Sequence, residues 1–310
     1  MIQISQLSHS YGQRRQPPRP ALLDLNLAVA ANTLFALTGP NGGGKSTLFR
    51  ILSGLSLPSQ GSVRINGIDT LRNPQAVRQL LGVVFQHPAL DKHLTILENL
   101  RIHADLHHID RHTFQERLAS DLGWSGLADR LHDRVGTLSG GTARRVELIK
   151  ALLHRPPVVL MDEPTNGLDP GARRDFFDNL LHLRRALGLT ILFTSHLFDE
   201  AEQADRVAIL HQGRLLASGS PAELRNQLGQ EMVILQTPQT EDRQQLLQLL
   251  AQRPAIRVTE HAQELRLTGI DADTLQRLLF HHREQFQSLA MHHPTLEDVF
   301  IHHTRTGNAP

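Results

Sequence analysis

The stretch from Gly39 to Thr47, GPNGGGKST, has residue types that could hold a phosphate group. Glycine loses more backbone freedom on folding than any other residue, so four glycines among six residues disfavour both a helix and a strand. Without side chains in the way, the backbone can curl until consecutive N–H groups point into one concavity that attracts anions. Lys45 and Ser46 add a positive charge and a hydroxyl. The stretch therefore predicts a site for phosphate oxygens.

The elements on either side must position this stretch. The apolar run TLFALT predicts a buried strand before it, and KSTLFRILSGL predicts a helix that begins near Lys45. A strand, G-x-x-x-x-G-K-[ST] and a helix make the P-loop arrangement, in which the lysine reaches the β- and γ-phosphates, the serine binds Mg²⁺ and the helix N-terminus adds positive charge. The loop consists of Gly39, Pro40, Asn41, Gly42, Gly43, Gly44, Lys45, Ser46 and Thr47. An ordinary glycine-rich turn is the alternative, but every fixed position of the arrangement is present.

Two adjacent carboxylates, Asp162 and Glu163, end a second buried strand, VVLMDE. One carboxylate suits a Mg²⁺ ligand, and its neighbour is placed to orient and deprotonate an attacking water. An acidic pair that merely begins a turn is the simpler explanation, but the segment DEPTNGLDP, which starts at Asp162, disfavours it.

A second anion-binding feature is LSGGT, Leu138 to Thr142, which opens a predicted helix. A serine, two glycines and a helix N-terminus can together hold an anion. As a bare string, the segment is also typical of an N-cap serine followed by flexible glycines. It gains weight only beside the loop and the carboxylates.

The composition limits the class of protein. The chain has 310 residues, 40% hydrophobic and 20% charged, which suits a soluble globular protein of one large or two ordinary domains. A net charge of +1 gives no global electrostatic reason to expect nucleic acid or an anionic membrane as partner. The absence of cysteine excludes disulfides and thiolate metal sites. We find no signal peptide and no apolar run of about eighteen residues, so we expect any membrane role to depend on a partner.

Strands that alternate with helices predict an α/β fold, and because the strands are continuously apolar, their parallel sheet should be covered on both faces. Near the N-terminus, IQISQLS and ALLDLNLAV predict two more strands, and RRQPPRP between them, Arg14 to Pro20, predicts a proline-rich basic loop. After about Ser220, a small α+β domain of roughly 90 residues with a split βαβ topology is predicted.

Four segments resemble the motifs of ABC-type ATPases, in that family's order: GPNGGGKST, VVFQ, LSGGTARRVELIKALLHRPPVVLMDEPTNGLDP and TSHLFDEAEQADRVAIL. The resemblance implies a P-loop NTPase (RecA-like) core at 1–219, with a mostly parallel sheet, an antiparallel β part and a helical subdomain at about 88–144. It implies an accessory α+β domain at 220–310. It also implies that the chain binds and hydrolyses ATP with Mg²⁺.

The resemblance assigns catalytic roles to three side chains. Glu163 would be the general base, Gln86 would contact the Mg²⁺ and water site, and His196 would contact the γ-phosphate. A lone histidine after a strand is more often a structural cap, but the TSH context favours the catalytic role. The Mg²⁺ ligands would be Ser46, Gln86 and Asp162.

The resemblance also implies which residues contact ATP. Tyr11 would stack on the adenine, although a surface tyrosine would look the same in the sequence. In this family the signature serine acts in trans, so two cassettes sandwich ATP, close when it binds and open after hydrolysis. The implied contacts are Tyr11, the loop from Gly39 to Thr47, Ser139, Gly140, Gly141 and Asp169, the last of which would connect the two sites.

Several positions depart from the common pattern of the family, and none of these departures removes a catalytic group. Thr142 stands where glutamine or a longer residue is frequent, and Gly43 stands where alanine is frequent. Thr142 could weaken closure of the sandwich, and the insert from Arg14 to Pro20 could alter the adenine side.

The implied partners are an integral membrane permease and a second cassette, either a copy of this chain or a related one. The chain would lie at the cytoplasmic face of the inner membrane as a peripheral subunit, with no nucleic acid. The C-terminal domain and HPTLEDVFIHHT are similar to the daunorubicin-type (ABC-2) exporter branch. Thr295 also predicts a helix N-cap with Asp298 at the third helical position, which is a purely structural explanation of that segment.

Two other functions fit parts of the sequence. A soluble ABC ATPase that acts on nucleic acid or ribosomes would usually carry two cassettes or a long coiled coil, and this chain has neither. Metal-related export would use the 19 histidines, among them the pairs His107/His108, His281/His282, His292/His293 and His302/His303. Adjacent residues on a helix point in different directions, so exposed histidines are the simpler explanation of these pairs.

Overall fold

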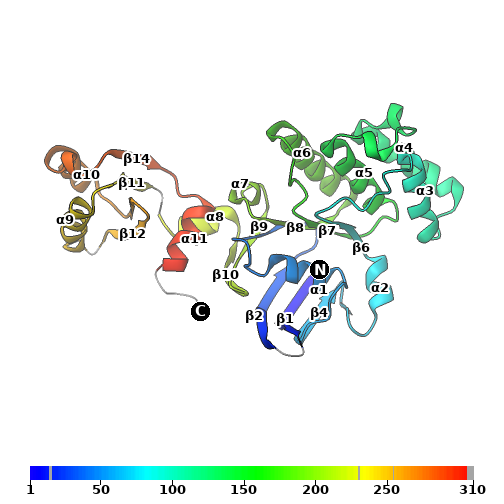
Figure 1. The fold of residues 1–310 in the computed structure, drawn as a ribbon, viewed down its shortest axis with the longest axis horizontal. Coiled ribbons are helices and arrows are strands. Elements are labelled where there is room, and N and C mark those ends of the chain that lie inside the picture. Colours follow the sequence, from blue (N-terminus) through cyan, green and yellow to red (C-terminus); the bar gives the residue numbers. More distant parts are fainter. Residues whose placement is uncertain (14–15, 230, 254, 306–310) are drawn as a thin grey trace. The chain divides into compact units, whose positions relative to one another are not determined.

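The computed structural model describes residues 1–13, 16–229, 231–253 and 255–305 (Figure 1). The chain divides into two compact units. The first comprises Met1–Glu200 and Ala204–Leu215, and the second comprises Ala201–Gln203 and the residues from Leu216 onward. No described helix is both long enough and apolar enough to cross a membrane.

The first unit is built on a six-stranded sheet in the order β10-β9-β3-β8-β7-β6, whose edge strand β10 continues past Leu215, the last residue of that unit. Its strands are β3 (Leu34–Thr38), β6 (Leu81–Val84), β7 (Val158–Asp162), β8 (Thr190–Ser195), β9 (Arg206–His211) and β10 (Arg214–Gly219). The five strands from β9 to β6 are parallel, and every residue of β3 and β8 is buried. Helices α1 (Lys45–Leu52) and α6 (Pro170–Leu187) lie on opposite sides of this sheet (Figure 1), which confirms the predicted parallel sheet with two covered faces.

An antiparallel sheet in the order β2-β1-β4-β5 packs on the other side of α1. Its strands are β1 (Ile2–Gln13), β2 (Gln16–Val29), β4 (Gln60–Ile65) and β5 (Ile68–Asp69). Buried side chains from both sheets and α1, such as Leu25, Phe49 and Leu160, form one core. The two sheets therefore hold α1, and with it the loop before it, between them.

The prediction of a loop from Arg14 to Pro20 is wrong for most of that segment. Residues from Gln16 belong to β2, where Pro20 pairs with Ser10 and Arg19 pairs with Tyr11, while Arg14 and Arg15 lie outside the described residues. Proline cannot donate a ladder hydrogen bond, but β2 is an edge strand, and an edge strand needs donors on one side only.

A helical subdomain is inserted in the chain between β6 and β7, which pair directly in the six-stranded sheet. It contains α3 (Ile96–Leu106), α4 (Arg111–Ser125) and α5 (Gly140–Leu152), with a separate buried core that includes Leu100, Phe114 and Ile149. Thr95 and Glu98 form a reciprocal cap at the start of α3. The remaining short helices of this unit are α2 (Pro74–Gln79) and α7 (Phe198–Ala201), with 3₁₀ turns at Ala128–Arg130 and Val135–Thr137.

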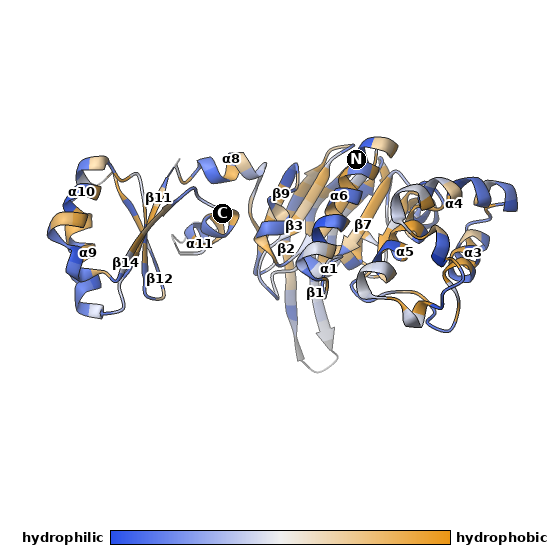
Figure 2. Ribbon diagram, turned by 90° about the horizontal axis from the view of Figure 1, so that it is seen from above, coloured by the Kyte–Doolittle hydropathy of each residue, from blue (hydrophilic) through white to orange (hydrophobic). Residues whose placement is uncertain are grey.

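The second unit has a four-stranded antiparallel sheet in the order β12-β13-β11-β14, which confirms the predicted split βαβ topology. Helices α9 and α10 lie on one side of the sheet and α11 on the other (Figure 2). Thr295 caps α11, and Asp298 completes the cap as predicted. The elements of this unit are α8 (Pro221–Asn226), β11 (Met232–Gln236), α9 (Thr240–Ala251), β12 (Arg257–His261), β13 (Glu264–Thr268), α10 (Ala272–His281), a 3₁₀ turn (Arg283–Gln285), β14 (Ser288–His292) and α11 (Leu296–Arg305).

Candidate functional site

The glycine-rich loop between β3 and α1 adopts a conformation that other residues disfavour. Gly39, Gly42 and Gly44 have φ angles of 133°, 78° and 107°, in the region where a side chain strains the backbone. A Cβ at Gly39 would lie 2.1 Å from the carbonyl oxygen of Leu210, and one at Gly44 would lie 2.8 Å from that of Ala21. The density of glycine in this stretch is therefore required by both backbone geometry and space.

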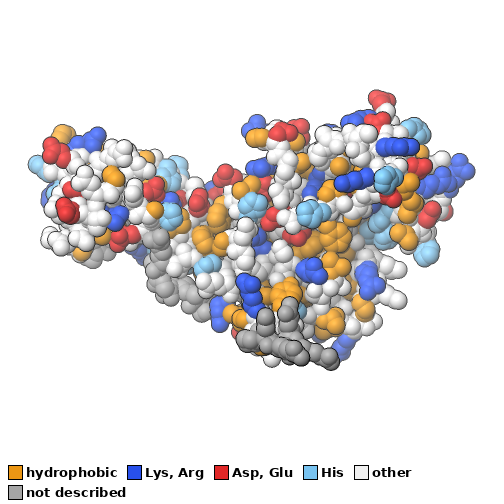
Figure 3. All heavy atoms as spheres, in the orientation of Figure 1, with side chains coloured by type: hydrophobic (Ala, Val, Ile, Leu, Met, Phe, Trp, Pro, Cys, Tyr) orange, Lys and Arg blue, Asp and Glu red, His pale blue; other side chains and the backbone are white. Residues whose placement is uncertain are grey.

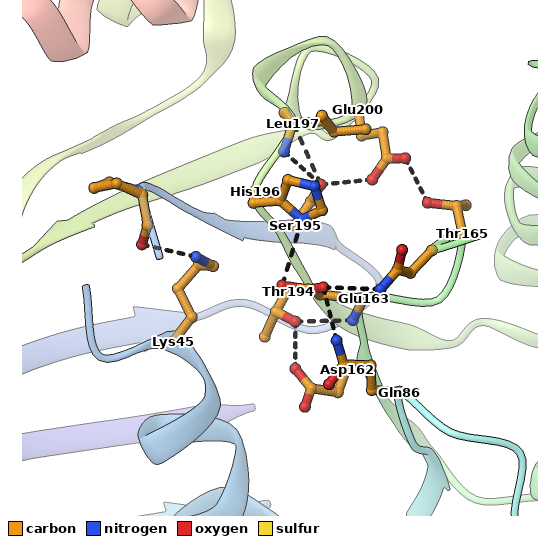
Figure 4. Close-up of polar contacts among 12 residues, drawn as sticks. Lys45, Gln86, Asp162, Glu163, Thr165, Thr194, Ser195, His196, Leu197 and Glu200 are labelled. Atoms are coloured by element: carbon orange, nitrogen blue, oxygen red, sulfur yellow. Dashed lines mark hydrogen bonds and ion pairs between the residues drawn. The ribbon is translucent and has the colours of Figure 1, made fainter. Parts of the chain in front are cut away.

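Lys45 extends back into the loop (Figure 4). Its Nζ donates hydrogen bonds to the carbonyl oxygens of Gly39 at 2.7 Å and Pro40 at 3.0 Å. Burial lowers the pKa of Lys45, while the carboxylates of Glu163 and Asp162 oppose this shift. The ammonium group is thus held at the concave side of the loop by neutral acceptors, which an anionic oxygen can replace.

A cavity of about 460 Å³ opens beside the loop. Tyr11, at the end of β1, donates from its hydroxyl to Thr47 Oγ1 at 3.2 Å, and its ring meets the ring of His9 edge-on. Because Tyr11 and Arg19 are paired across β1 and β2, Arg19 also lines the cavity, which the predicted loop did not anticipate. The described lining residues are Tyr11, Arg19, Pro20, Ala21, Asn41, Gly42, Gly43, Gly44, Lys45, Ser46, Thr47 and Glu163.

Three of the predicted catalytic side chains meet where parallel strands end. Gln86 follows β6, Glu163 follows β7, and His196 follows β8. Gln86 Nε2 donates to Glu163 Oε2 at 3.0 Å, and His196 Nδ1 lies 3.4 Å from Glu163 Oε1 (Figure 4). Asn166 Nδ2 also donates to Glu163 Oε2, at 3.5 Å, so both carboxylate oxygens have neighbours. The backbone of Glu163 is also strained. The φ angle of Glu163, 44°, is uncommon for a residue with a side chain, and such strain is concentrated at functional sites.

Thr194, on β8, links the acidic pair and was not predicted from the sequence. Its Oγ1 donates to Asp162 Oδ1 at 2.6 Å and accepts a hydrogen bond from the Glu163 N–H at 2.9 Å. Burial raises the pKa of Asp162, and the hydrogen bond from Thr194 opposes that shift. A hydroxyl at the end of a buried apolar strand, in TILFTSH, was the signal available in the sequence.

A buried carboxylate behind this cluster was also missed. Ser195 Oγ donates to Glu200 Oε2 at 2.5 Å, and Thr165 donates to the other oxygen. Arg173 of α6 lies 3.3 Å from the same carboxylate. Glu200 thereby connects the segment around His196 with the turn after Glu163 and with α6.

The segment from Leu138 to Thr142, the second predicted anion-binding feature, forms the N-terminal cap of α5. Ser139 caps α5, where its Oγ accepts from the Thr142 N–H at 3.3 Å and shares a hydrogen bond of 2.9 Å with the Thr142 hydroxyl. Asp169 caps α6 by accepting from the N–H groups of Gly171 and Ala172. Some residues predicted to contact ATP are not among the described residues that line the cavity. They are Ser139, Gly140, Gly141 and Asp169, together with Gly39 and Pro40 from the loop itself.

Residues 22–166 match the ABC transporter family, and residues 219–304 match the ATP-binding protein DrrA1-3-like C-terminal domain family. The chain is 34% identical to the daunorubicin resistance ATP-binding protein DrrA3 of Streptomyces coeruleorubidus, over 94% of this chain and 93% of the relative. It is 30% identical to the linearmycin resistance ATP-binding protein LnrL of Bacillus subtilis, over 98% of each chain.

A solved structure gives the same result for the first unit. A dimeric ATP-binding cassette in a post-hydrolysis state, bound to ADP and phosphate, superposes with a TM-score of 0.64 at 27% identity, over 71% of this chain and 98% of that one. Both relatives are named as resistance ATP-binding proteins and the chain matches the ABC transporter family, which favours a transport function over a soluble ATPase acting on nucleic acid or ribosomes. The chain belongs to the ABC transporter family of ATP-hydrolysing subunits, in the daunorubicin-resistance branch of exporter ATPases.

Proposed function

We propose that this chain hydrolyses Mg²⁺-bound ATP at the 39–47 loop and thereby drives export through a separate integral membrane permease, from the cytoplasmic face of the inner membrane. The convergence of Gln86, Glu163 and His196 at one edge of the sheet, beside the cavity that contains Lys45, supports this proposal most strongly. The direction of transport is proposed from the relatives, whose names record resistance to daunorubicin and linearmycin.

ATP would bind with its phosphates inside the glycine-rich loop. There the free N–H groups of the curled backbone and the N-terminus of α1 favour negative charge. Lys45 would exchange its two carbonyl acceptors for the β- and γ-phosphate oxygens. Tyr11, held to the loop through Thr47 and 46% exposed, would present its ring to the adenine.

Mg²⁺ fits the residues proposed for it. Ser46, Gln86 and Asp162 offer a hydroxyl, an amide carbonyl and a carboxylate, which are the oxygen donors that this ion prefers. When bound, the ion would supply positive charge to the β- and γ-phosphates. The chain's own contribution is to orient these donors, for which the hydrogen bond from Thr194 to Asp162 is in place.

Glu163 would take the proton from the water that attacks the γ-phosphate. One of its oxygens is fixed by Gln86, and the other lies beside His196. His196 would contact the γ-phosphate oxygens, where negative charge must be stabilised during phosphoryl transfer. Rotation of His196 away from Glu163 would free Oε1 for the water, whereas Oε2 also accepts a hydrogen bond from Asn166.

A second cassette would complete the site. Ser139 and Gly140 are exposed at the start of α5, so they are free to meet ATP held by another subunit. ATP would then close two cassettes on each other, and hydrolysis would let them separate, with Asp169 connecting the two sites. In this arrangement residues 1–219 form the ATPase and residues 220–310 an accessory domain.

Co-purification tests the proposed transport function. A non-catalytic variant, Glu163→Gln, is tagged at its N-terminus and recovered from gently solubilised membranes in the presence of ATP, with Lys45→Ala as the matched variant that should not close. We expect a stoichiometric protein with several membrane spans to accompany Glu163→Gln. Recovery only from the soluble fraction, with ribosomes or nucleic acid, would contradict a transport function.

A further inference from the structure

Three histidines from distant parts of the sequence meet in the helical subdomain. His103 lies on α3, His107 is the C-cap residue of that helix one turn later, and His154 follows the end of α5. Each offers a ring nitrogen, and these three nitrogens all lie within 4.8 Å of one another. In the described part of the chain, this is the one group of three or more His, Cys, Asp or Glu side chains so arranged.

The cluster differs from the other histidines of the chain. Histidine side chains appear at several separate places on the surface in Figure 3, as expected for solvated groups. His108, the sequence neighbour of His107, is exposed and is not a member of the cluster. The adjacent pair in the sequence therefore does not form a shared site, and the cluster takes only one residue from it.

Two nitrogens of the cluster are buried without a partner. His103 Nε2 and His154 Nδ1 have no hydrogen-bond partner among the described residues. A buried polar atom without a partner is unfavourable, so each such atom needs an explanation. His154 Nε2 lies 3.1 Å from the carbonyl oxygen of Leu81. If this nitrogen donates to the carbonyl, the lone pair is on Nδ1, which has no partner among the described residues.

We propose that His103, His107 and His154 bind one transition-metal ion, with Zn²⁺ as the expected type. Three imidazoles with a fourth position open to water are a common Zn²⁺ set, and a backbone carbonyl on the far nitrogen is a typical outer contact. His107 and His154 are partly exposed, which leaves a path for the ion and the water. This site is distinct from the nucleotide site and does not depend on the proposed function.

The donor atoms and their protonation state indicate which class of ion would bind. Burial lowers the pKa of His103 to about 3 and that of His154 to about 4, so both rings are neutral near pH 7, as metal ligands must be. Lys150 and Arg117 also lower these pKa values, so positive charge is close by. The three imidazole donors disfavour Mg²⁺ and Ca²⁺, which prefer oxygen donors, whereas Zn²⁺ and its neighbours bind imidazole strongly enough to offset the nearby positive charge.

The rings must move to bind the ion. His107 and His154 are stacked, with ring centroids 4.0 Å apart and an angle of 13° between the planes. Zn–N bonds of about 2.0–2.1 Å in a tetrahedral site require nitrogens roughly 3.3 Å apart, so the rings must turn out of the stack and their nitrogens must approach by up to about 1.5 Å. The bound ion would join α3 to the end of α5 and, through Leu81, to β6.

Metal titration tests this site directly. The full chain, carrying no histidine tag and freed of metal with a chelator, is titrated with Co²⁺ and followed by visible absorption, then back-titrated with Zn²⁺. His107→Gln and His154→Gln remove one ligand each, and His108→Gln is the matched control outside the cluster. ATP hydrolysis and the thermal unfolding curve of each metal-free variant report whether it is folded.

We expect one Co²⁺ per native chain, displaced by one Zn²⁺, and the same for His108→Gln. His107→Gln should bind at least about tenfold more weakly while still hydrolysing ATP, and His154→Gln should show the same loss. If all four proteins bind alike, or if the native chain binds several ions weakly with no tetrahedral spectrum, the cluster is not a metal site.

Discussion

Two helices of the first unit begin with a serine- and glycine-containing segment that could bind an anion, and they begin in different ways. The N-terminus of α1 lies in a cavity with Lys45 aimed into it, and its glycines are forced by the fold, since a Cβ at Gly39 would lie 2.1 Å from a backbone oxygen. The N-terminus of α5 is exposed, and its serine is already engaged as a cap. A Cβ at Gly140 would have ordinary space, with its nearest contact at 3.8 Å.

The comparison shows that a helix N-terminus is only part of a site. The loop before α1 combines a concave backbone, a positive charge and the absence of obstructing side chains, which are the features that the proposed phosphate site needs. At α5, glycine is not needed for the fold of this chain, so its purpose must be sought outside it. We infer that Gly140 is small because another surface approaches there, as the proposed second cassette would.

The largest effect should follow from Lys45→Ala. Loss of the ammonium group from the cavity removes a charge-assisted contact to the phosphates, so we expect hydrolysis to fall roughly 10³-fold and ATP binding to weaken. Phosphate release and binding of a fluorescent ATP analogue measure the two effects. Lys92→Ala removes an exposed lysine outside the cavity and should leave both unchanged.

Glu163→Gln separates hydrolysis from binding. The amide keeps the shape of the side chain but cannot accept a proton, so hydrolysis should fall roughly 10²-fold or more while ATP still binds. The same two assays apply, with Glu116→Gln on the exposed face of α4 as the matched change. Turnover at the native rate would show that another group is the base.

The two glycine positions should respond in opposite ways. Gly39→Ala must shift the backbone, so we expect the free energy of unfolding in urea to fall by about 2 kcal/mol or more. For Gly140→Ala the free energy of unfolding should equal or exceed that of the native chain, because alanine is the better helix former by about 1 kcal/mol. Its hydrolysis should nevertheless fall roughly tenfold, since the methyl group stands where ATP of the second cassette would approach. Full activity in Gly140→Ala would contradict the inference that another surface approaches Gly140.

Tyr11→Ala should have the smallest effect. Loss of ring stacking on the adenine is expected to weaken ATP binding by about 1 kcal/mol, or roughly fivefold. Tyr11→Phe keeps the ring and removes only the hydrogen bond to Thr47, so it should bind nearly as well as the native chain. Equal affinities of the alanine variant and the native chain would place the adenine elsewhere.

Local patterns in the sequence were sufficient for the elements that carry the site. The strand, glycine loop and helix around Lys45, and the ends of the strands before Gln86, Glu163 and His196, follow from periodicity and motif, and adjacent parallel strands then bring their ends together. The topology of the second unit was also predictable, because its strands and helices alternate clearly.

What the sequence did not reveal depends on pairing between distant segments. Proline and arginine suggested a loop before Ala21, yet pairing with β1 extends β2 through it and brings Arg19 to the cavity. Thr194 and Glu200 are single polar residues. Their hydrogen-bond partners, Asp162 for Thr194 and Thr165 for Glu200, lie more than thirty residues away in the sequence. His154 joins His103 and His107 only after α3 and α5 have packed together.

The central claim is that the loop before α1 and the start of α5 act together only across two chains. Ser139→Ala and Lys45→Ala are each purified, mixed in equal amounts and assayed for ATP hydrolysis. A mixed dimer would have one site that lacks both groups and one site that keeps both. With random pairing, we predict recovery to roughly a quarter of native activity, well above either variant alone. A mixture no more active than the average of its two components would contradict the composite site.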